Sequence, residues 1–171
     1  TGDPKLVDFG LSLRVDDQPD ADGSTVGQVG SPGFMAPEVV SGDSYSTSAD
    51  VYSLGATLYY LLTARTTPVP IDSQWDLNSP NRDHWVAYAE RLASCEPVLP
   101  RQLNADIPTS LQDVCLKALE RDAGTRYATA TEFADDLQRF LDGRPVLATP
   151  LVYNTKLATE IDQTIQQVGT W

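Results

Sequence analysis

The first residue of this chain with a clear chemical potential is Asp8, within "PKLVDFG" from Pro4 to Gly10. Residues 5–7 predict a short strand, so Asp8 would stand where the strand ends. A carboxylate in that position, with a glycine two residues later, suits a Mg²⁺ ion beside a phosphate, because a hard cation prefers oxygen ligands. Only seven residues precede Asp8, too few for a loop that cradles phosphates. Asp8 is therefore predicted to be a metal ligand whose nucleotide-binding neighbours do not precede it here.

Further candidate residues lie downstream in a fixed order. A polar stretch without periodicity follows Gly10 and predicts a long loop. After it comes "GSPGFMAPEVV", residues 30–40, which contains Ala36-Pro37-Glu38. Asp50 follows near the start of an apolar helical pattern, and Arg126 stands between the last two predicted helices with capping residues. A lone Asp-Phe-Gly is weak evidence, but this ordered set is specific.

Helices are the main elements that would position these residues. Residues 48–63 carry apolar side chains on nearly all sides, which predicts a helix that is buried all round. Gly143 and Pro145 would end the last strong helix, and a weak helix is predicted from about Thr155 to Val168. Three more helices are predicted from their first residues, which combine a capping side chain with a proline or a capping-box partner: Ser79-Pro80, Thr109 with Gln112, and Thr129 with Glu132.

Composition and charge narrow the class of protein. The chain has 171 residues, of which 41% are hydrophobic, enough for one domain with a buried core. Lys and Arg number 12 against 24 acids, a net charge of −12 that disfavours nucleic acid and anionic membrane surfaces as partners. Cys95 and Cys115 show no metal-type spacing and are expected to be reduced packing thiols. With no apolar run of about 20 residues and no signal peptide, the chain is expected to lack a membrane span and to be cytoplasmic.

Taken together, Asp8-Phe9-Gly10, Ala36-Pro37-Glu38, Asp50 and Arg126 resemble the Ser/Thr protein kinases, particularly the bacterial relatives of the eukaryotic type. The resemblance runs from about residue 4 to residue 145. It implies a mainly α fold, the helical C-terminal lobe of a protein kinase with a short edge strand at the N-terminus. Residues 1–145 would form a partial kinase domain, and residues 146–171 a C-terminal tail. Within that domain, the activation segment would be residues 8–38 and the helical subdomain residues 39–145.

The resemblance also gives the early residues their roles. Asp8 would coordinate the Mg²⁺ that bridges the ATP phosphates, while Phe9 and Gly10 would form a switch between active and inactive settings. Ser31 would help to hold the catalytic aspartate and lysine, and its loop with Gly33 would receive the substrate residue after the target hydroxyl. The pattern favours a Ser or Thr target. If the family resemblance is set aside, the sequence is also compatible with simpler roles. Asp8 would then be a turn acid at the end of a strand, Phe9 a core residue, and residues 31–33 a simple turn.

Three charged residues are structural anchors by the same resemblance. Glu38 and Arg126 would form a buried ion pair that pins the end of the activation segment to the turn between the last two helices, a two-pronged contact for which a guanidinium is suited. Asp50 would accept backbone N–H bonds from the catalytic loop. The residues alone are also compatible with two unrelated surface charges and with an acid placed for the helix dipole.

Ser24 and Thr25 are candidate phosphorylation sites, because kinases of this type are often phosphorylated in this loop. A phosphate there would need nearby cations to order it. Arg14 is the only base between Gly10 and Gly30, and four aspartates in the same stretch would repel the phosphate. The sequence leaves the modification open.

Several parts of a complete kinase are not found in the sequence. The only histidine is His84, and no Gly-x-Gly-x-x-Gly occurs, so the chain would begin just after the catalytic loop. We therefore expect the 171 residues alone to be inactive, with ATP and Mg²⁺ bound only in the complete kinase. The expected partners are a protein substrate and the missing N-lobe and catalytic loop. Loss of their cover would expose apolar side chains of residues 48–63 and favour self-association.

Three functions are compatible with these residues. The first is a Ser/Thr kinase that transfers the ATP γ-phosphate to protein once complete. The second is a pseudokinase-type scaffold that only binds partners. The presence of four intact family residues argues against it: Asp8, Gly10, Glu38 and Arg126. The third is an unrelated helical protein-interaction module, which would have to explain the ordered motifs as an accident.

Overall fold

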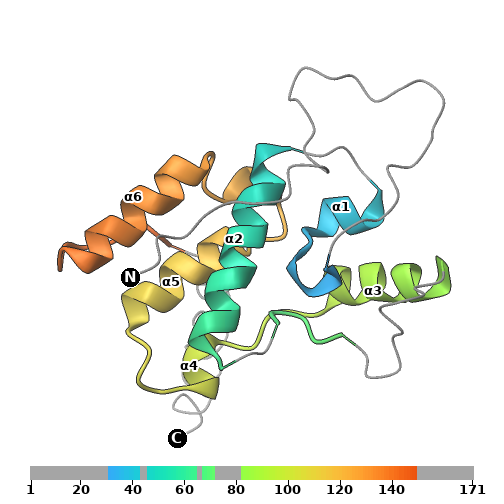
Figure 1. The fold of residues 1–171 in the computed structure, drawn as a ribbon, viewed down its shortest axis with the longest axis horizontal. Helices are drawn as coiled ribbons and strands as arrows, with labels where there is room; N and C mark the ends of the chain where they lie inside the picture. Colours follow the sequence, from blue (N-terminus) through green and yellow to red (C-terminus); the bar gives the residue numbers. More distant parts are fainter. Residues whose placement is uncertain (1–30, 43–45, 65–66, 72–81, 150–171) are drawn as a thin grey trace, which may run out of the picture.

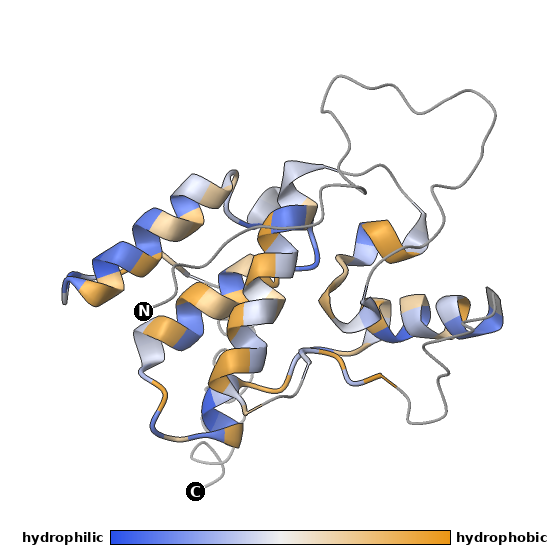
Figure 2. Ribbon diagram, viewed as in Figure 1, coloured by the Kyte–Doolittle hydropathy of each residue, from blue (hydrophilic) through white to orange (hydrophobic). Residues whose placement is uncertain are grey.

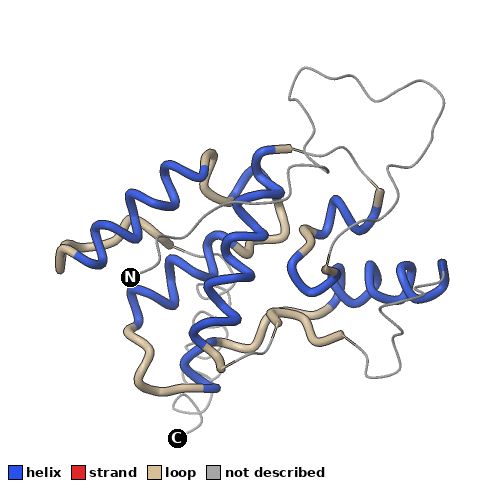
Figure 3. Tube along the Cα trace, viewed as in Figure 1, coloured by secondary structure: helices blue, strands red, loops and turns tan. Residues whose placement is uncertain are grey.

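All regular structure in the described part of the chain is helical (Figures 1 and 3). The computed structural model describes residues 31–42, 46–64, 67–71 and 82–149, so the predicted strand at residues 5–7 and the weak helix from residue 155 lie outside it. The mainly α prediction is confirmed. The elements are the 3-10 helix η2 (Pro32–Phe34), α1 (Pro37–Ser41), α2 (Thr47–Leu62), α3 (Arg82–Ser94), α4 (Pro100–Leu103), α5 (Thr109–Ala118), the 3-10 helix η3 (Ala123–Thr125) and α6 (Ala130–Leu141).

Helix α2 is the central element (Figure 1). It contacts α5 and α6 on one side and η2 on another, and α1 packs against α3. Gly55 allows α2 to approach α5 closely, since a Cβ on it would lie 2.7 Å from the Cβ of Ala118. At the same crossing the Cys115 thiol donates a hydrogen bond to the Gly55 carbonyl oxygen at 3.6 Å. Burial raises the pKa of the Cys115 thiol, which fits its predicted role in packing.

Two clusters of buried side chains make the core. The larger one joins α2 to α1, α3 and the end of α5 through aromatic and aliphatic residues, among them Tyr52, Tyr59, Trp85, Tyr88 and Leu119. The smaller one joins α2 to α5 and α6 and consists of Val51, Val114, Ala118, Tyr127, Phe133 and Ala148. The packed part of the chain therefore extends to Ala148, within the segment predicted to be the tail, residues 146–171.

The prediction that α2 is buried all round is wrong, whereas the expectation that residues 48–63 show exposed apolar side chains in this chain is confirmed. Leu54 is 40% exposed and Leu61 is 72% exposed, and the intervening Thr57 is exposed as well. These positions recur every three or four residues and so share one face of the helix. No described element covers that face, which explains how an apolar helix can keep two leucines in contact with solvent.

The predicted capping box at the start of α5 is also wrong. Pro108 is the N-cap residue, with no side-chain cap, and Thr109 is the first helical residue. Gln112 is 2% exposed, and its Oε1 accepts the backbone N–H of Arg101 at 3.1 Å. The Thr109 hydroxyl accepts a hydrogen bond from the Arg101 side chain. Both side chains are thus drawn toward α4 instead of the helix end.

The predicted capping of α6 by Thr129 is confirmed, although the Glu132 carboxylate reaches the residue before the N-cap residue and not the N-cap residue itself. Thr129 Oγ1 accepts the backbone N–H of Glu132 at 3.1 Å, and Glu132 Oε2 accepts that of Ala128 at 2.9 Å. Gly143, with φ 68°, follows the end of the helix as predicted. Figure 2 shows hydrophilic and hydrophobic residues alternating along α6, and Leu141 at its end is 72% exposed. Among the described helices, none combines the length and apolar character needed to cross a bilayer.

Candidate functional site

The structure describes about half of the predicted site residues. Asp8, Phe9 and Gly10 lie outside the described residues, as do Ser24 and Thr25. The other predicted residues come from η2, α1, the start of α2 and the turn before α6. Within the described ranges, His, Cys, Asp and Glu side chains nowhere gather in a group that could hold a metal ion.

Glu38 is positioned by the short helix α1. Ala36 is the N-cap residue with extended backbone, and Pro37 is the first helical residue, where its fixed φ and missing N–H are favourable. Glu38 follows in the first turn, where the helix dipole favours a negative charge. Gly42 ends the helix in the left-handed conformation, with φ 85°. The sequence thus builds one tight turn whose acid faces inward, since the Glu38 side chain is only 18% exposed.

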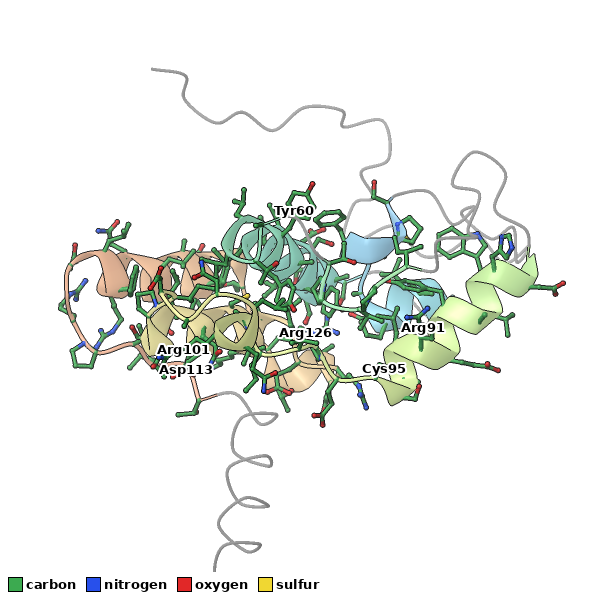
Figure 4. All side chains as sticks on the ribbon, turned by 90° about the horizontal axis from the view of Figure 1, so that it is seen from below. Tyr60, Arg91, Cys95, Arg101, Asp113 and Arg126 are labelled. Carbon is green, nitrogen blue, oxygen red and sulfur yellow. The ribbon has the colours of Figure 1, made fainter. Side chains whose placement is uncertain are left out.

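Arg126 is positioned by the 3-10 helix η3, which immediately precedes it. Asp122 caps η3 by accepting the backbone N–H of Gly124 at 2.9 Å. The hydroxyl of Ser48 donates to the Ala123 carbonyl oxygen at 3.0 Å and so fastens η3 to the first turn of α2. The Arg126 side chain is fully buried, in the middle of the described part of the molecule (Figure 4).

Glu38 and Arg126 form a two-pronged ion pair, as predicted. Arg126 Nη1 donates to Glu38 Oε1 at 2.6 Å, and Nη2 donates to Oε2 at 2.8 Å. The remaining N–H groups donate to backbone carbonyl oxygens: Nε to Glu120 at 2.7 Å, Nη1 to Ser48 at 3.0 Å and Nη2 to Arg121 at 3.0 Å. All five guanidinium donors are therefore satisfied, which is the condition for a stable buried cation.

Sequence reasoning missed the aromatic partner of this ion pair. The Arg126 guanidinium carbon lies 5.0 Å from the centre of the Tyr52 ring, within range of a cation–π interaction. Tyr52 is 4% exposed, and burial raises the pKa of its hydroxyl, with the neighbouring Tyr88 acting in the same direction. Tyr52 lies one helical turn after Ser48, whose carbonyl oxygen accepts a hydrogen bond from Arg126. The helical spacing of these two residues is the sequence signal that places Tyr52 on the same face of α2 as Ser48.

Residues 31–33 form a turn that packs against the chain segment after α2. Ser31 is exposed, and its carbonyl oxygen accepts the backbone N–H of Phe34 at 2.9 Å. Gly33 is buried, and a Cβ on it would lie 2.5 Å from the Cγ2 atom of Thr67. The Thr67 hydroxyl donates to the Val69 carbonyl oxygen at 3.0 Å, which holds that side chain in place. Only glycine fits this contact without a shift.

Phe34 connects the same turn to α2. The hydroxyl of Ser53 donates to the Phe34 carbonyl oxygen at 2.9 Å. The Phe34 ring lies 5.6 Å from the ring of Tyr60, centre to centre, in a tilted arrangement; Figure 4 labels Tyr60. Two contacts about two turns apart on α2 thus fix the backbone between residue 31 and α1.

Asp50 is not drawn into this cluster. It lies in the first turn of α2, as predicted, and its side chain is exposed. Between described residues, no hydrogen bond reaches its carboxylate. Its predicted role as an acceptor for the catalytic loop stays a prediction.

Comparison with known proteins identifies the family. Residues 1–137 match the protein kinase domain. The chain belongs to the protein kinase family. A probable serine/threonine-protein kinase of Streptomyces coelicolor is 32% identical over 148 residues, covering 86% of this chain and 20% of the relative. The serine/threonine-protein kinase PknB of Mycolicibacterium smegmatis is 33% identical over 140 residues, covering 82% and 20%. PknD of Chlamydia felis is 32% identical over 133 residues, covering 76% and 12%.

These matches confirm the resemblance to bacterial Ser/Thr protein kinases. The chain spans a fifth or less of the length of these relatives. The kinase match includes both partners of the ion pair and ends within α6. The segment that follows α6 lies beyond the match but is still packed on the domain, through Ala148.

Proposed function

We propose that this chain supplies the activation segment and helical base of a Ser/Thr protein kinase. In complete form that kinase transfers the γ-phosphate of ATP to a protein Ser or Thr. The observation that carries the proposal is the Glu38–Arg126 pair, in which two N–H donors of Arg126 bind Glu38 on α1 and the other three bind backbone carbonyl oxygens of α2 and of the segment after α5. Phosphoryl transfer depends on positioning, so a firmly held activation segment is what such an enzyme needs.

The roles of the individual residues are part of this proposal. Asp8 would hold a Mg²⁺ ion, which would neutralise charge on the ATP phosphates, and Phe9 and Gly10 would form the conformational switch. The turn containing Ser31 and Gly33 receives the substrate, which fits its attachment to α2 and to Thr67. Residues 1–145 form the kinase part of the chain, and residues 146–171 form a tail. Asp50 accepts backbone N–H bonds from the catalytic loop. Ser24 and Thr25 are phosphorylation sites. A cytoplasmic location, where ATP is available, completes the proposal.

The activity is tested by comparing the complete natural protein with residues 1–171 alone. Each is incubated with radiolabelled ATP, Mg²⁺ and a protein substrate, and the labelled amino acids are identified. We expect phosphoserine and phosphothreonine from the complete protein and no transfer from residues 1–171, which contain no His-Arg-Asp catalytic loop. Label on tyrosine would contradict the proposed target. Absence of transfer by the complete protein would favour a pseudokinase scaffold.

Self-association of residues 1–171 is proposed from the open face of α2. Leu54 and Leu61 are 40% and 72% exposed on that face, so a second copy can bury them. We expect light scattering after size exclusion to show a dimer or larger species, and the double variant Leu54→Ser/Leu61→Ser to elute as a monomer. Leu141→Ser is the matched control, because Leu141 is also 72% exposed but lies on α6. A wild-type chain that is monomeric and melts cooperatively would contradict the proposal.

A further inference from the structure

The segment after α6, residues 144–149, is fastened to the domain and is called the strap here. The backbone N–H of Leu147 donates to Asp136 Oδ1 at 2.7 Å. Arg139 Nε donates to the Pro145 carbonyl oxygen at 2.8 Å, and the backbone N–H of Arg144 donates to the Arg139 carbonyl oxygen at 2.9 Å. Three hydrogen bonds therefore hold the strap along α6.

Asp136 is the buried centre of these contacts, with 1% exposure. Its second oxygen, Oδ2, accepts the hydroxyl of Tyr127 at 2.8 Å, and Arg139 Nε lies 3.9 Å from Oδ1. Burial and the hydrogen bond to Asp136 raise the pKa of Tyr127, so its hydroxyl stays a donor. A buried carboxylate is costly when it loses a partner, so the position of Asp136 depends on both Tyr127 and the strap.

The strap also reaches the core beneath α2. Ala148 is 6% exposed and packs in the cluster that contains Val51 and Tyr127, with Val146 packed against the same cluster. Val51 lies on α2 next to Tyr52, which stacks on the Arg126 guanidinium. Tyr127 directly follows Arg126 in the chain. The strap and the Glu38–Arg126 pair thus share two supports, α2 and the backbone at residues 126–127.

We propose that the strap is a conformational control element for the end of the activation segment. When it is seated, it holds Tyr127 and Val51 in the positions that let Arg126 bind Glu38. When it is withdrawn, Asp136 loses one of its two short hydrogen bonds, the small cluster loses Ala148, and α1 is released more easily. The chain continues from the strap beyond residue 149. A pull or a partner acting on that continuation would therefore change how firmly α1 is held. The coupling between the strap and α1 does not depend on the proposed function. Only the effect of that coupling on kinase activity rests on the proposed function.

The test compares Leu147→Pro with Leu147→Ala in the complete natural protein. Leu147 is 65% exposed, so removing its side chain alone changes little packing. Proline also removes the backbone N–H that Asp136 accepts, whereas alanine keeps it. Amide hydrogen exchange is followed at α1, where Val39 and Val40 donate to the Ala36 carbonyl oxygen, and at α3 as an internal reference.

We expect amide exchange in α1 to be about tenfold faster in Leu147→Pro than in Leu147→Ala, because loss of one buried hydrogen bond has an effect of this size. Exchange in α3 should change little. Faster exchange confined to the strap and α6 would overturn the proposal. If Leu147→Pro raises amide exchange throughout the protein, the variant Asp136→Asn is measured instead. This substitution removes the carboxylate charge and leaves one oxygen acceptor, but it does not alter the strap backbone. Faster exchange of α1 than of α3 in Asp136→Asn supports the proposal, and equal changes overturn it. Exchange does not require catalysis, so an inactive protein would leave this result interpretable.

Discussion

Replacing Arg126 by alanine is expected to destabilise the protein far more than replacing Arg139 by alanine. The Arg126 side chain is fully buried and makes five hydrogen bonds, so its removal leaves the Glu38 carboxylate and three carbonyl oxygens without their donor. Breaking a buried ion pair in this way costs roughly 3–5 kcal/mol. For a domain of this size, that corresponds to a fall of roughly 6–20 °C in the thermal midpoint. Circular dichroism during heating of the complete protein measures it.

Arg139 is the matched control because it also lies near an acid but is 30% exposed in its side chain. It is 3.9 Å from Asp136 and donates one hydrogen bond to Pro145, so its loss is expected to cost about 1 kcal/mol or less. Arg126→Lys adds a second test, since lysine keeps the charge but lacks the fork that matches both Glu38 oxygens. We expect it to lose most of the stability that alanine loses. Equally small losses in all three variants would mean that the pair does not anchor the segment.

The parts of the fold that sequence reasoning predicted correctly are those decided locally. Thr129 caps α6 and Glu132 reaches back to the backbone N–H of Ala128 because both act within one turn, and the end of α6 at Gly143 needs only a residue that tolerates positive φ. The same pattern failed at Thr109 and Gln112, where Arg101 competes for both side chains. A competitor from another helix is invisible to a local pattern. For α2, composition alone did not tell which of its faces lacks a covering element.

The candidate site shows the same limit. Glu38 and Arg126 are 88 residues apart, so no spacing rule joins them, and only the family resemblance predicted their contact. The three carbonyl oxygens and the Tyr52 ring that complete the Arg126 environment have no signature in residue type. The docking of residues 146–148 was missed because Asp136, which accepts a strap N–H, looks like one more surface acid on α6. Its burial depends on how Tyr127 and the strap meet it.

Replacing Asp8 by alanine in the complete protein is expected to lower phosphoryl transfer by about a hundredfold or more, on the scale of losing one preorganised electrostatic group. The reason is the proposed role of its carboxylate as a Mg²⁺ ligand, since the metal neutralises the charge that builds up on the phosphates. The measurement is the initial rate of substrate labelling at saturating ATP and several Mg²⁺ concentrations.

Asp16→Ala is the matched control, because Asp16 is an acid eight residues further along the same proposed segment and has no proposed metal role. We expect it to keep the wild-type rate. The thermal midpoint separates the Asp8 effect from that of the anchor: Asp8→Ala should lose activity while melting close to wild type, whereas Arg126→Ala should lose stability. If Asp8→Ala keeps the wild-type rate, the metal assignment is wrong, although the Glu38–Arg126 pair would still hold the end of the segment. If it instead melts as early as Arg126→Ala, the acid serves the fold, and the chemistry must be sought elsewhere.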